Sequence, residues 1–351
     1  MDLRPVLSLA AVLVGALIYL FAGESAAKAG ALVAVGALLV FTSGEDVALG
    51  FKRLGARLGL SSYLSGSISS FASNLPELAV SVLLVANPAL RELAVLMVIL
   101  AAAFNLLLLS VVILVLARRG GYVEVPREAV ESEVEAIRLT ITYSFLLACL
   151  GILLNVFGAE PYVPREVMLV PLASFAGYFY FMVRGSQQAE GGEKEAEHRE
   201  ERGEGWVLPL LVGFVSLAAG AEYISHAAEF FTEAMHLNIV LTAMVVAFAG
   251  SIPEHSIALV SARRGEVEMG ISNVVGGVVQ SLMVVLPLVG LVAPIPLDGY
   301  IVFQLMVTSA SLWLLEKAVM DDSRFTVDEG LFILLAQLMG LLLLDELSFM
   351  I

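Results

Sequence analysis

Two stretches of the chain read ASNLPELAVS, at residues 72–81, and AGSIPEHSIA, at residues 249–258. Each places a Pro-Glu pair inside an apolar run, and the two pairs end at Glu77 and Glu254. A carboxylate in an apolar run of this kind is costly to bury, so two such pairs in matching surroundings indicate a repeat with a function.

A second pair of landmarks has nearly the same spacing along the chain. Gly44, in the sequence Gly-Glu-Asp, corresponds to Gly220, in the sequence Gly-Ala-Glu. The step from Gly44 to Gly220 is shorter by a single residue than the step from Glu77 to Glu254. Two landmarks at almost one offset do not arise easily by chance, so the chain is predicted to contain an internal repeat.

The composition assigns the chain to the membrane proteins. It has 351 residues, of which 59% are hydrophobic and 15% charged, whereas a soluble domain carries about 25% charged residues. Its apolar runs are close to the length of about 20 residues that a membrane helix needs, which excludes an outer-membrane barrel. The net charge of −15 argues against nucleic acid as a partner. The lone Cys149 cannot form an intramolecular disulfide.

The fold predicted from these runs is an all-α membrane protein with about eleven transmembrane helices. The first run follows Arg4 and precedes small residues, so it is either a retained helix, which we favour, or a signal peptide. The predicted spans are 5–22, 28–50, 60–86, 92–117, 135–157, 164–183, 206–231, 237–262, 267–291, 299–317 and 326–346.

The basic residues give the orientation. With the N-terminus in the cytoplasm, all of the 19 Lys and Arg residues except Lys28, Arg91 and Arg165 fall on the cytoplasmic side. Since cytoplasmic loops carry an excess of Lys and Arg, we expect a multi-pass protein of the cell membrane with a cytoplasmic N-terminus and an external C-terminus.

The repeat divides the chain into parts. Residues 1–27 form an extra N-terminal helix, residues 28–184 a first five-helix repeat, and residues 206–351 a second. Residues 185–205 are polar and rich in Glu, and are predicted to be an acidic cytoplasmic linker. Because five spans separate the copies, the second enters the membrane from the opposite side. Inverted repeats are typical of secondary transporters, whose ion sites lie near the bilayer midplane where helices are broken.

The Pro-Glu pairs suggest the chemistry of such a site. Proline removes a backbone donor and frees carbonyl oxygens in the preceding turn. Those oxygens, beside Glu77, Glu254 and neighbouring hydroxyl and amide groups, are the hard ligands that Ca²⁺ prefers. No thiolate or imidazole cluster in the sequence favours zinc or copper. We expect Ca²⁺ as a transported ion and no cofactor.

These residues resemble the sodium/calcium exchanger family, within the calcium:cation antiporters. The α-repeat motifs of that family correspond to residues 72–109 and 249–290 here. The resemblance implies that Glu77 and Glu254 are central carboxylates shared by Ca²⁺ and a counter-ion. It also implies oxygen ligands at the following positions: Ser73, Asn74, Asn105, Gly250, Ser251 and Ser281.

The sequence departs from the family pattern near the expected ion site. The hydroxyls expected near Ala101 and Gly277, which would help to bind Na⁺, are missing. His255 replaces an apolar residue, and either exchanges protons or is a hydrogen-bonded structural group. Outside the motifs, Asp46 and Glu222 lie toward the ends of their spans and are interpreted as snorkelling or helix-pairing residues.

The leading functional hypothesis is Na⁺/Ca²⁺ antiport by alternating access in the lipid bilayer. Cation/H⁺ antiport through the same carboxylates is the alternative within this class. A membrane cation sensor or scaffold that does not transport is the alternative from another class. The sequence contains no H-E-x-x-H or G-x-S-x-G motif, and we expect no enzymatic activity.

Overall fold

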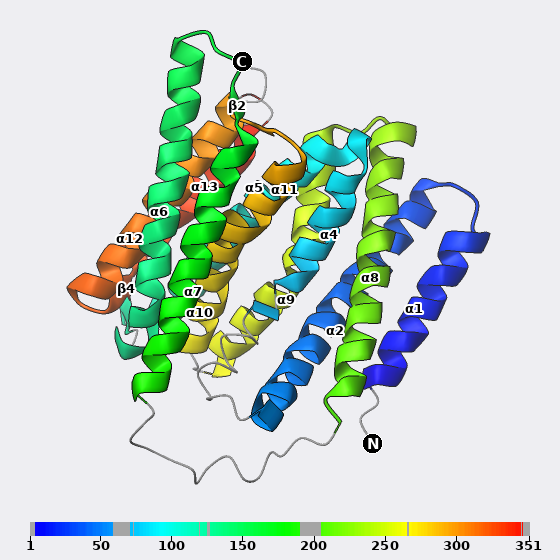
Figure 1. Ribbon diagram of the computed structural model, residues 1–351, viewed down its shortest axis with the longest axis horizontal. Coiled ribbons are helices and arrows are strands. Elements are labelled where there is room, and N and C mark those ends of the chain that lie inside the picture. Colours follow the sequence, from blue (N-terminus) through cyan, green and yellow to red (C-terminus); the bar gives the residue numbers. More distant parts are fainter. Residues whose placement is uncertain are drawn as a thin grey trace. The chain divides into compact units, whose positions relative to one another are not determined.

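The computed structural model describes residues 4–58, 71–72, 74–118, 120–124, 127–189, 205–264, 267–344 and 346. These residues are mostly helical, and short strands occur in the connections (Figure 1). The helices are α1 (Arg4–Phe21), α2 (Ala26–Leu58), α4 (Leu75–Ala86), α5 (Arg91–Ala117), α6 (Arg127–Val156), α7 (Leu169–Ala189), α8 (Val207–Glu229), α9 (Ile239–Arg264), α10 (Val267–Gln280), α11 (Leu286–Val292), α12 (Gly299–Asp321) and α13 (Val327–Leu342).

Shorter elements connect these helices. The 3₁₀ turns are η1 (Pro88–Leu90) and η2 (Arg165–Met168), and the π-helical turns are η4 (Phe230–Ala234) and η5 (Ser281–Val285). The strands are β1 (Tyr122–Glu124), β2 (Tyr162–Val163), β3 (Ile295–Pro296) and β4 (Arg324–Thr326).

Within the described residues, every predicted span coincides with a helix, which confirms the all-α membrane fold. The ninth span consists of α10, η5 and α11 together, and the third is described only from α4 onward. Helix α2 extends to Leu58 and α6 begins at Arg127, beyond the predicted apolar limits, because a helix can continue through polar residues after it leaves the apolar layer. Of the predicted linker, α7 takes residues 185–189, and residues 190–204 lie outside the described part.

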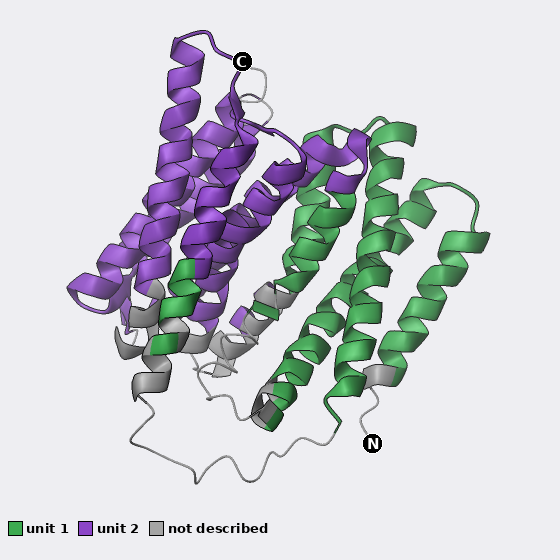
Figure 2. Cartoon of the chain, viewed as in Figure 1, with its two compact units in different colours: residues 1–84, 177–253 green, residues 85–176, 254–351 purple. Residues whose placement is uncertain are grey.

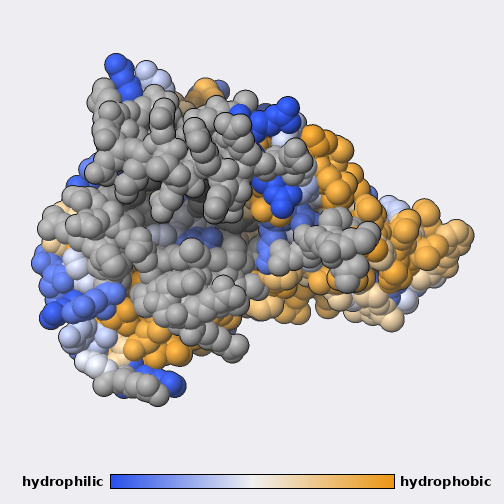
Figure 3. Space-filling model, turned by 90° about the horizontal axis from the view of Figure 1, so that it is seen from below, coloured by the Kyte–Doolittle hydropathy of each residue, from blue (hydrophilic) through white to orange (hydrophobic). Residues whose placement is uncertain are grey.

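The described part includes six helices that are long and apolar enough to cross a membrane. They are Ala26–Phe51, Pro88–Ala117, Val134–Val156, Val207–Ala234, Gly270–Val292 and Gly299–Asp321. Many large apolar side chains are exposed, including Leu13 and Leu17 on α1 and Leu335 on α13, and apolar residues are visible at the surface in Figure 3. Exposed apolar surface of this extent fits a multi-pass membrane protein whose outer side chains face lipid.

The chain forms two compact units, each built from parts of both halves of the sequence (Figure 2). Unit 1 comprises residues 1–84 and 177–253, and unit 2 comprises residues 85–176 and 254–351.

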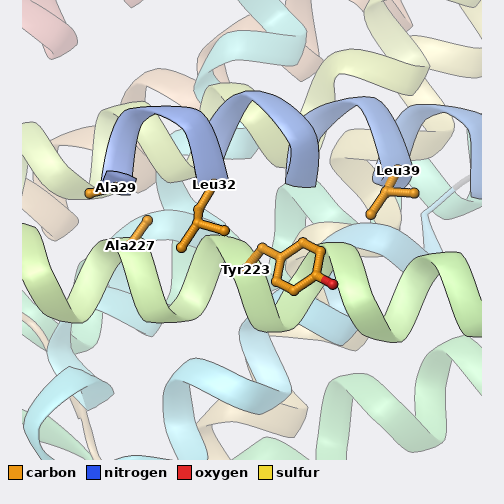
Figure 4. Close-up of a cluster of buried hydrophobic side chains, with 5 residues drawn as sticks. All are labelled: Ala29, Leu32, Leu39, Tyr223 and Ala227. Carbon is orange, nitrogen blue, oxygen red and sulfur yellow. The ribbon is translucent and has the colours of Figure 1, made fainter. Parts of the chain in front are cut away.

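In unit 1, α2 and α8 pack closely along their length. The buried cluster of Ala29, Leu32 and Leu39 on α2 lies against Tyr223 and Ala227 on α8 (Figure 4). The two helices are joined by these apolar contacts over several turns, so most of the stability of this interface comes from van der Waals contact in close packing.

Glycines allow the backbones of α2 and α8 to approach. A Cβ atom built on Gly36 would lie 2.9 Å from the carbonyl oxygen of Gly220, and one on Gly213 would lie 3.0 Å from the backbone nitrogen of Val47. Gly50 packs in the same way on Leu210. Small residues at such positions are typical of membrane helix pairs, because association there depends on van der Waals contact rather than on exclusion of water.

Helix α1 docks on α2 and α8 in the same unit. The Tyr223 hydroxyl donates a hydrogen bond of 2.9 Å to the carbonyl oxygen of Val12. At the connection to α2, the Lys28 ammonium donates to Glu24 at 2.6 Å, and His226 of α8 lies 3.7 Å from the same carboxylate oxygen. This hydrogen bond from Lys28 lowers the pKa of Glu24.

In unit 2, helices α5, α6, α10, α12 and α13 pack together, and two antiparallel ribbons tie their connections. Strand β1, after α5, pairs with β4, after α12. Strand β2, after α6, pairs with β3, after α11. Each ribbon therefore joins a connection of the first half of the sequence to one of the second half.

Polar contacts between helices add to this packing in unit 2. Arg138 on α6 donates to Glu316 on α12 through Nη2 at 2.8 Å and through Nε at 3.0 Å. Gln304 on α12 donates to Gln337 on α13 at 2.7 Å, and Gln337 donates to Ser311 at 3.1 Å. Inside a membrane such bonds fix the contact between two helices.

Candidate functional site

Glu77 lies in the first turn of α4 and its side chain is 1% exposed. The helix begins at Leu75, so Pro76 occupies the first turn, where its missing N–H would have had no partner within the helix. The free N–H groups and the positive end of the helix dipole favour a negative charge in this turn. The free N–H groups and the helix dipole therefore offset part of the cost of burying a carboxylate at this position.

The second Pro-Glu pair lies in a different local structure. Helix α9 runs without interruption from Ile239 to Arg264 and includes Pro253 and Glu254. The side chain of Glu254 lies outside the described part of the chain. The expected break at the proline is therefore seen only in the first copy, where a turn at Asn74 precedes α4. Packing against neighbouring helices allows a membrane helix to continue through a proline.

Asn105 and His255 are in contact within unit 2. Nε2 of His255 lies 3.1 Å from Oδ1 of Asn105, and Asn105 is completely buried in α5. Of the two interpretations of His255, this hydrogen bond to another helix supports the structural one. It also fixes the orientation of an amide that the sequence singles out as an ion ligand.

Ser281 is the first residue of the π-helical turn η5 and is completely buried. Turns of this kind inside longer helices are frequent at functional sites, because the wider turn leaves backbone groups free of the regular ladder. Helix α5, which carries Asn105, packs against η5. These two predicted ligands thus lie on adjacent elements of unit 2.

The remaining predicted ligands belong to unit 1. Asn74 is buried in the turn before α4, and Gly250 and Ser251 are buried in α9. The Ser251 hydroxyl donates to the carbonyl oxygen of Ala247 at 3.0 Å, which leaves its own lone pairs for another partner. Ser73 lies outside the described residues.

The departures from the family pattern are also located. Ala101 is completely buried in α5, and Gly277 lies in α10, which packs against α5. Neither position offers a side-chain oxygen. A Na⁺ ion held near these positions would need oxygens from elsewhere.

From the sequence, Asp46 is interpreted as a snorkelling or helix-pairing residue and is not included among the candidate ligands. It is 5% exposed and its Cβ atom lies beside Gly213 of α8, so it pairs with a helix and does not snorkel. In the sequence, the signal for this residue is an acidic side chain within an apolar run. In the structure it lies one residue before Val47, which contacts Gly213 of α8. Glu222, its counterpart in the repeat, is exposed.

Comparison with family models matches the second half of the chain. Residues 206–345 match the family model described as sodium/calcium exchanger protein. No curated protein matches the sequence.

Solved exchangers share the fold. The crystal structure of the H⁺/Ca²⁺ exchanger CAX matches with a TM-score of 0.73 and 15% identity, over 98% of this chain and 92% of that one. The sodium-calcium exchanger NCX_Mj, soaked with 100 mM Na⁺ and 10 mM Sr²⁺, matches with a TM-score of 0.62 and 18% identity, over 91% of this chain and 99% of that one. Residues 206–345 are thus similar to the sodium/calcium exchanger family, and nearly the whole chain has the fold of the solved exchangers.

Proposed function

We propose that the protein is a secondary-active antiporter that exchanges Ca²⁺ for Na⁺ across the cell membrane. The observation that carries this proposal is the burial of Glu77 in the first turn of α4, at the position that the repeat matches with Glu254. A buried carboxylate in a membrane protein marks an ion pathway by default. The CAX and NCX_Mj proteins both exchange Ca²⁺ for another cation, which supports the same class of substrate here.

In this proposal Glu77 and Glu254 together hold one Ca²⁺ or the counter-ions, but not both at once. Two carboxylates balance the charge of a divalent ion, and amide, hydroxyl and backbone oxygens complete its coordination. Asn105 and Ser281, which the resemblance implies as oxygen ligands, are the proposed neutral ligands. Because the ions compete for one site, transport of one is coupled to transport of the other.

Exchange of Ca²⁺ for H⁺ is a second candidate, and the missing hydroxyls at Ala101 and Gly277 favour it. Protonation of a carboxylate replaces Na⁺ binding without any additional oxygen ligand. The two candidates share the same carboxylates, so they differ in the driving gradient and not in the Ca²⁺ ligands.

The test is uptake of radioactive Ca²⁺ into proteoliposomes that contain the full chain. An outward Na⁺ gradient and an outward proton gradient are imposed separately. Uptake driven by Na⁺ is the expected result, and uptake driven only by protons establishes the second candidate. No uptake under either gradient, with correctly folded protein, would contradict antiport of Ca²⁺ and favour a sensor or scaffold.

The assignment of the carboxylates has its own test. Glu77→Gln and Glu254→Gln keep the size of the side chain but remove its charge and replace one acceptor oxygen by an NH₂ donor, and each is expected to abolish Ca²⁺ uptake. Glu222→Gln, at an exposed position, is the matched control and should transport normally. Uptake near the wild-type rate in either central variant would show that the assignment is wrong.

A further inference from the structure

A second buried carboxylate, Asp46, lies away from the α-repeats. It belongs to the membrane span Ala26–Phe51 of α2 and is 5% exposed. A buried aspartate in a membrane helix costs on the order of 2.5–3.5 kcal/mol on insertion scales, so such residues usually have a functional reason to be there. Its neighbour Glu45 is exposed, which shows that the helix turns one of two adjacent acids inward.

Two buried serines accompany Asp46 in the interface of α2 and α8. Ser43, on α2, donates its hydroxyl proton to the carbonyl oxygen of Val40 at 2.8 Å, so its oxygen lone pairs remain available. Ser216, on α8, is completely buried, and its hydroxyl has no hydrogen-bond partner among the described residues. A buried hydroxyl without a protein partner points to a ligand or water at that place.

The register of the two helices brings these serines to one level. Gly213 of α8 packs on Val47 of α2, and Gly220 packs on Val40. Ser216 lies three residues after the first glycine and four before the second, so it is on the same face of α8. Ser216 therefore lies midway between the two glycine contacts, opposite Ser43 of α2. Asp46 lies within one turn of Ser43 along α2.

Helix α1 supplies a third buried hydroxyl to this unit. Ser8 is buried although Leu7 and Leu9 on either side are exposed, so it lies on the face of α1 that packs on α2 and α8. Its hydroxyl also has no hydrogen-bond partner among the described residues. Counting along the hairpin from the connection at residues 22–25 places Ser8 level with Leu39, one turn from Ser43.

We propose that Asp46, with the hydroxyls of Ser43 and Ser216, forms a binding site for Na⁺ within unit 1. One carboxylate balances one positive charge, whereas Ca²⁺ at the same place would leave a buried net charge. Carboxylate and hydroxyl oxygens are hard ligands that suit an alkali cation. The residues of this site all belong to unit 1, and the proposal stands whether or not the central carboxylates carry Ca²⁺.

The test is equilibrium binding of radioactive Na⁺ to the purified full chain in detergent, without Ca²⁺ and with choline as the replacement cation. Asp46→Asn is expected to raise the Na⁺ concentration for half-saturation about tenfold or more, since a charged ligand is lost. Ser216→Ala should cause a smaller increase. Glu45→Gln, which removes the adjacent exposed acid, is the matched control and should bind like the wild type.

A Glu77→Gln background separates this site from the proposed central one. Na⁺ binding that persists in Glu77→Gln and is lost in the double variant with Asp46→Asn supports the site. Unchanged Na⁺ binding in Asp46→Asn, or loss of all Na⁺ binding in Glu77→Gln alone, overturns it.

Thermal denaturation in choline chloride shows whether each variant is folded, so that a loss of Na⁺ binding can be distinguished from a loss of folding. Each variant must show a cooperative transition in the absence of Na⁺, and the Na⁺-dependent rise in Tm is then compared between variants. Ser216→Ala removes one oxygen and little volume, so it tests the site even where Asp46→Asn disturbs the packing. A Tm that depends on Asp46 and on pH, but not on Na⁺, would show a proton site and would equally overturn the proposal.

Discussion

The close approach of α2 and α8 predicts different effects for the same substitution at two glycines of α2. A Cβ atom at Gly36 would lie 2.9 Å from the carbonyl oxygen of Gly220 and 2.7 Å from Cγ1 of Ile224. Carbon and oxygen atoms in ordinary weak contacts are about 3.3–3.6 Å apart. The backbones must therefore separate by several tenths of an ångström to accept Gly36→Ala. At Gly30 the same Cβ atom meets nothing within 4 Å.

The magnitude follows from comparing the two variants. Alanine in place of glycine favours a helix by about 1 kcal/mol at either position, so this contribution cancels in the difference. The extra methyl group in a close-packed contact costs about 1–3 kcal/mol. We therefore expect Gly36→Ala to be less stable than Gly30→Ala by about 1–3 kcal/mol, with Gly30→Ala equal to or more stable than the wild type.

The assay is reversible unfolding of the purified protein in mixed micelles with increasing denaturing detergent, followed by circular dichroism. Both variants are compared with the wild type under identical lipid and salt conditions, and the free energy of unfolding is compared between them. Equal stability of the two variants would refute the close approach of the helices at Gly36, because the packing cost is the only difference between them.

Two further predictions concern charged pairs. Arg138→Gln should lower the free energy of unfolding by about 0.5 kcal/mol, since the half-exposed bond to Glu316 is partly screened by solvent. A double-mutant cycle with Glu316→Gln should give a favourable coupling energy of about 0.2–1 kcal/mol, and a coupling of zero would contradict a stabilising contribution from the pair. The Lys28 ammonium lowers the pKa of Glu24, so the stabilisation from this pair is present above the ordinary value of 4.5 and is lost as the pH falls through the lowered folded-state pKa. The Tm difference between wild type and Lys28→Gln should therefore shrink in acid and in high salt, and a difference that grows on acidification would contradict the pairing.

The sequence alone determined the membrane fold and the number of spans. Apolar runs of about 20 residues report directly on the solvent that surrounds them, because every backbone group in lipid must be bonded within a helix. The Pro-Glu pairs at Glu77 and Glu254 revealed the internal repeat, since a carboxylate in an apolar run is too costly to occur twice without a reason. The resemblance to the sodium/calcium exchanger family, and the hypothesis of cation transport, rested on those residues.

The limits of the helices and their local geometry could not be predicted as well from the sequence. The continuation of α9 through Pro253 and the π-helical turn that begins at Ser281 are not indicated by residue type at either position. Local preference for a break at proline is of the order of 3 kcal/mol, and the contacts of a buried membrane helix can offset it. A rule based on one residue type could not anticipate which of the two prolines starts a helix and which lies within one.

Only the tertiary structure decided which polar residues lie inside. Asp46 and Glu45 are adjacent acids in one apolar run, and sequence hydropathy treats them alike. Packing against Gly213 buries Asp46 and leaves Glu45 exposed, because successive residues of a helix point about 100° apart and α8 covers only one face of α2. Hydropathy along the chain measures the surrounding solvent, but the neighbour that a side chain meets is set by the register of helices distant in sequence.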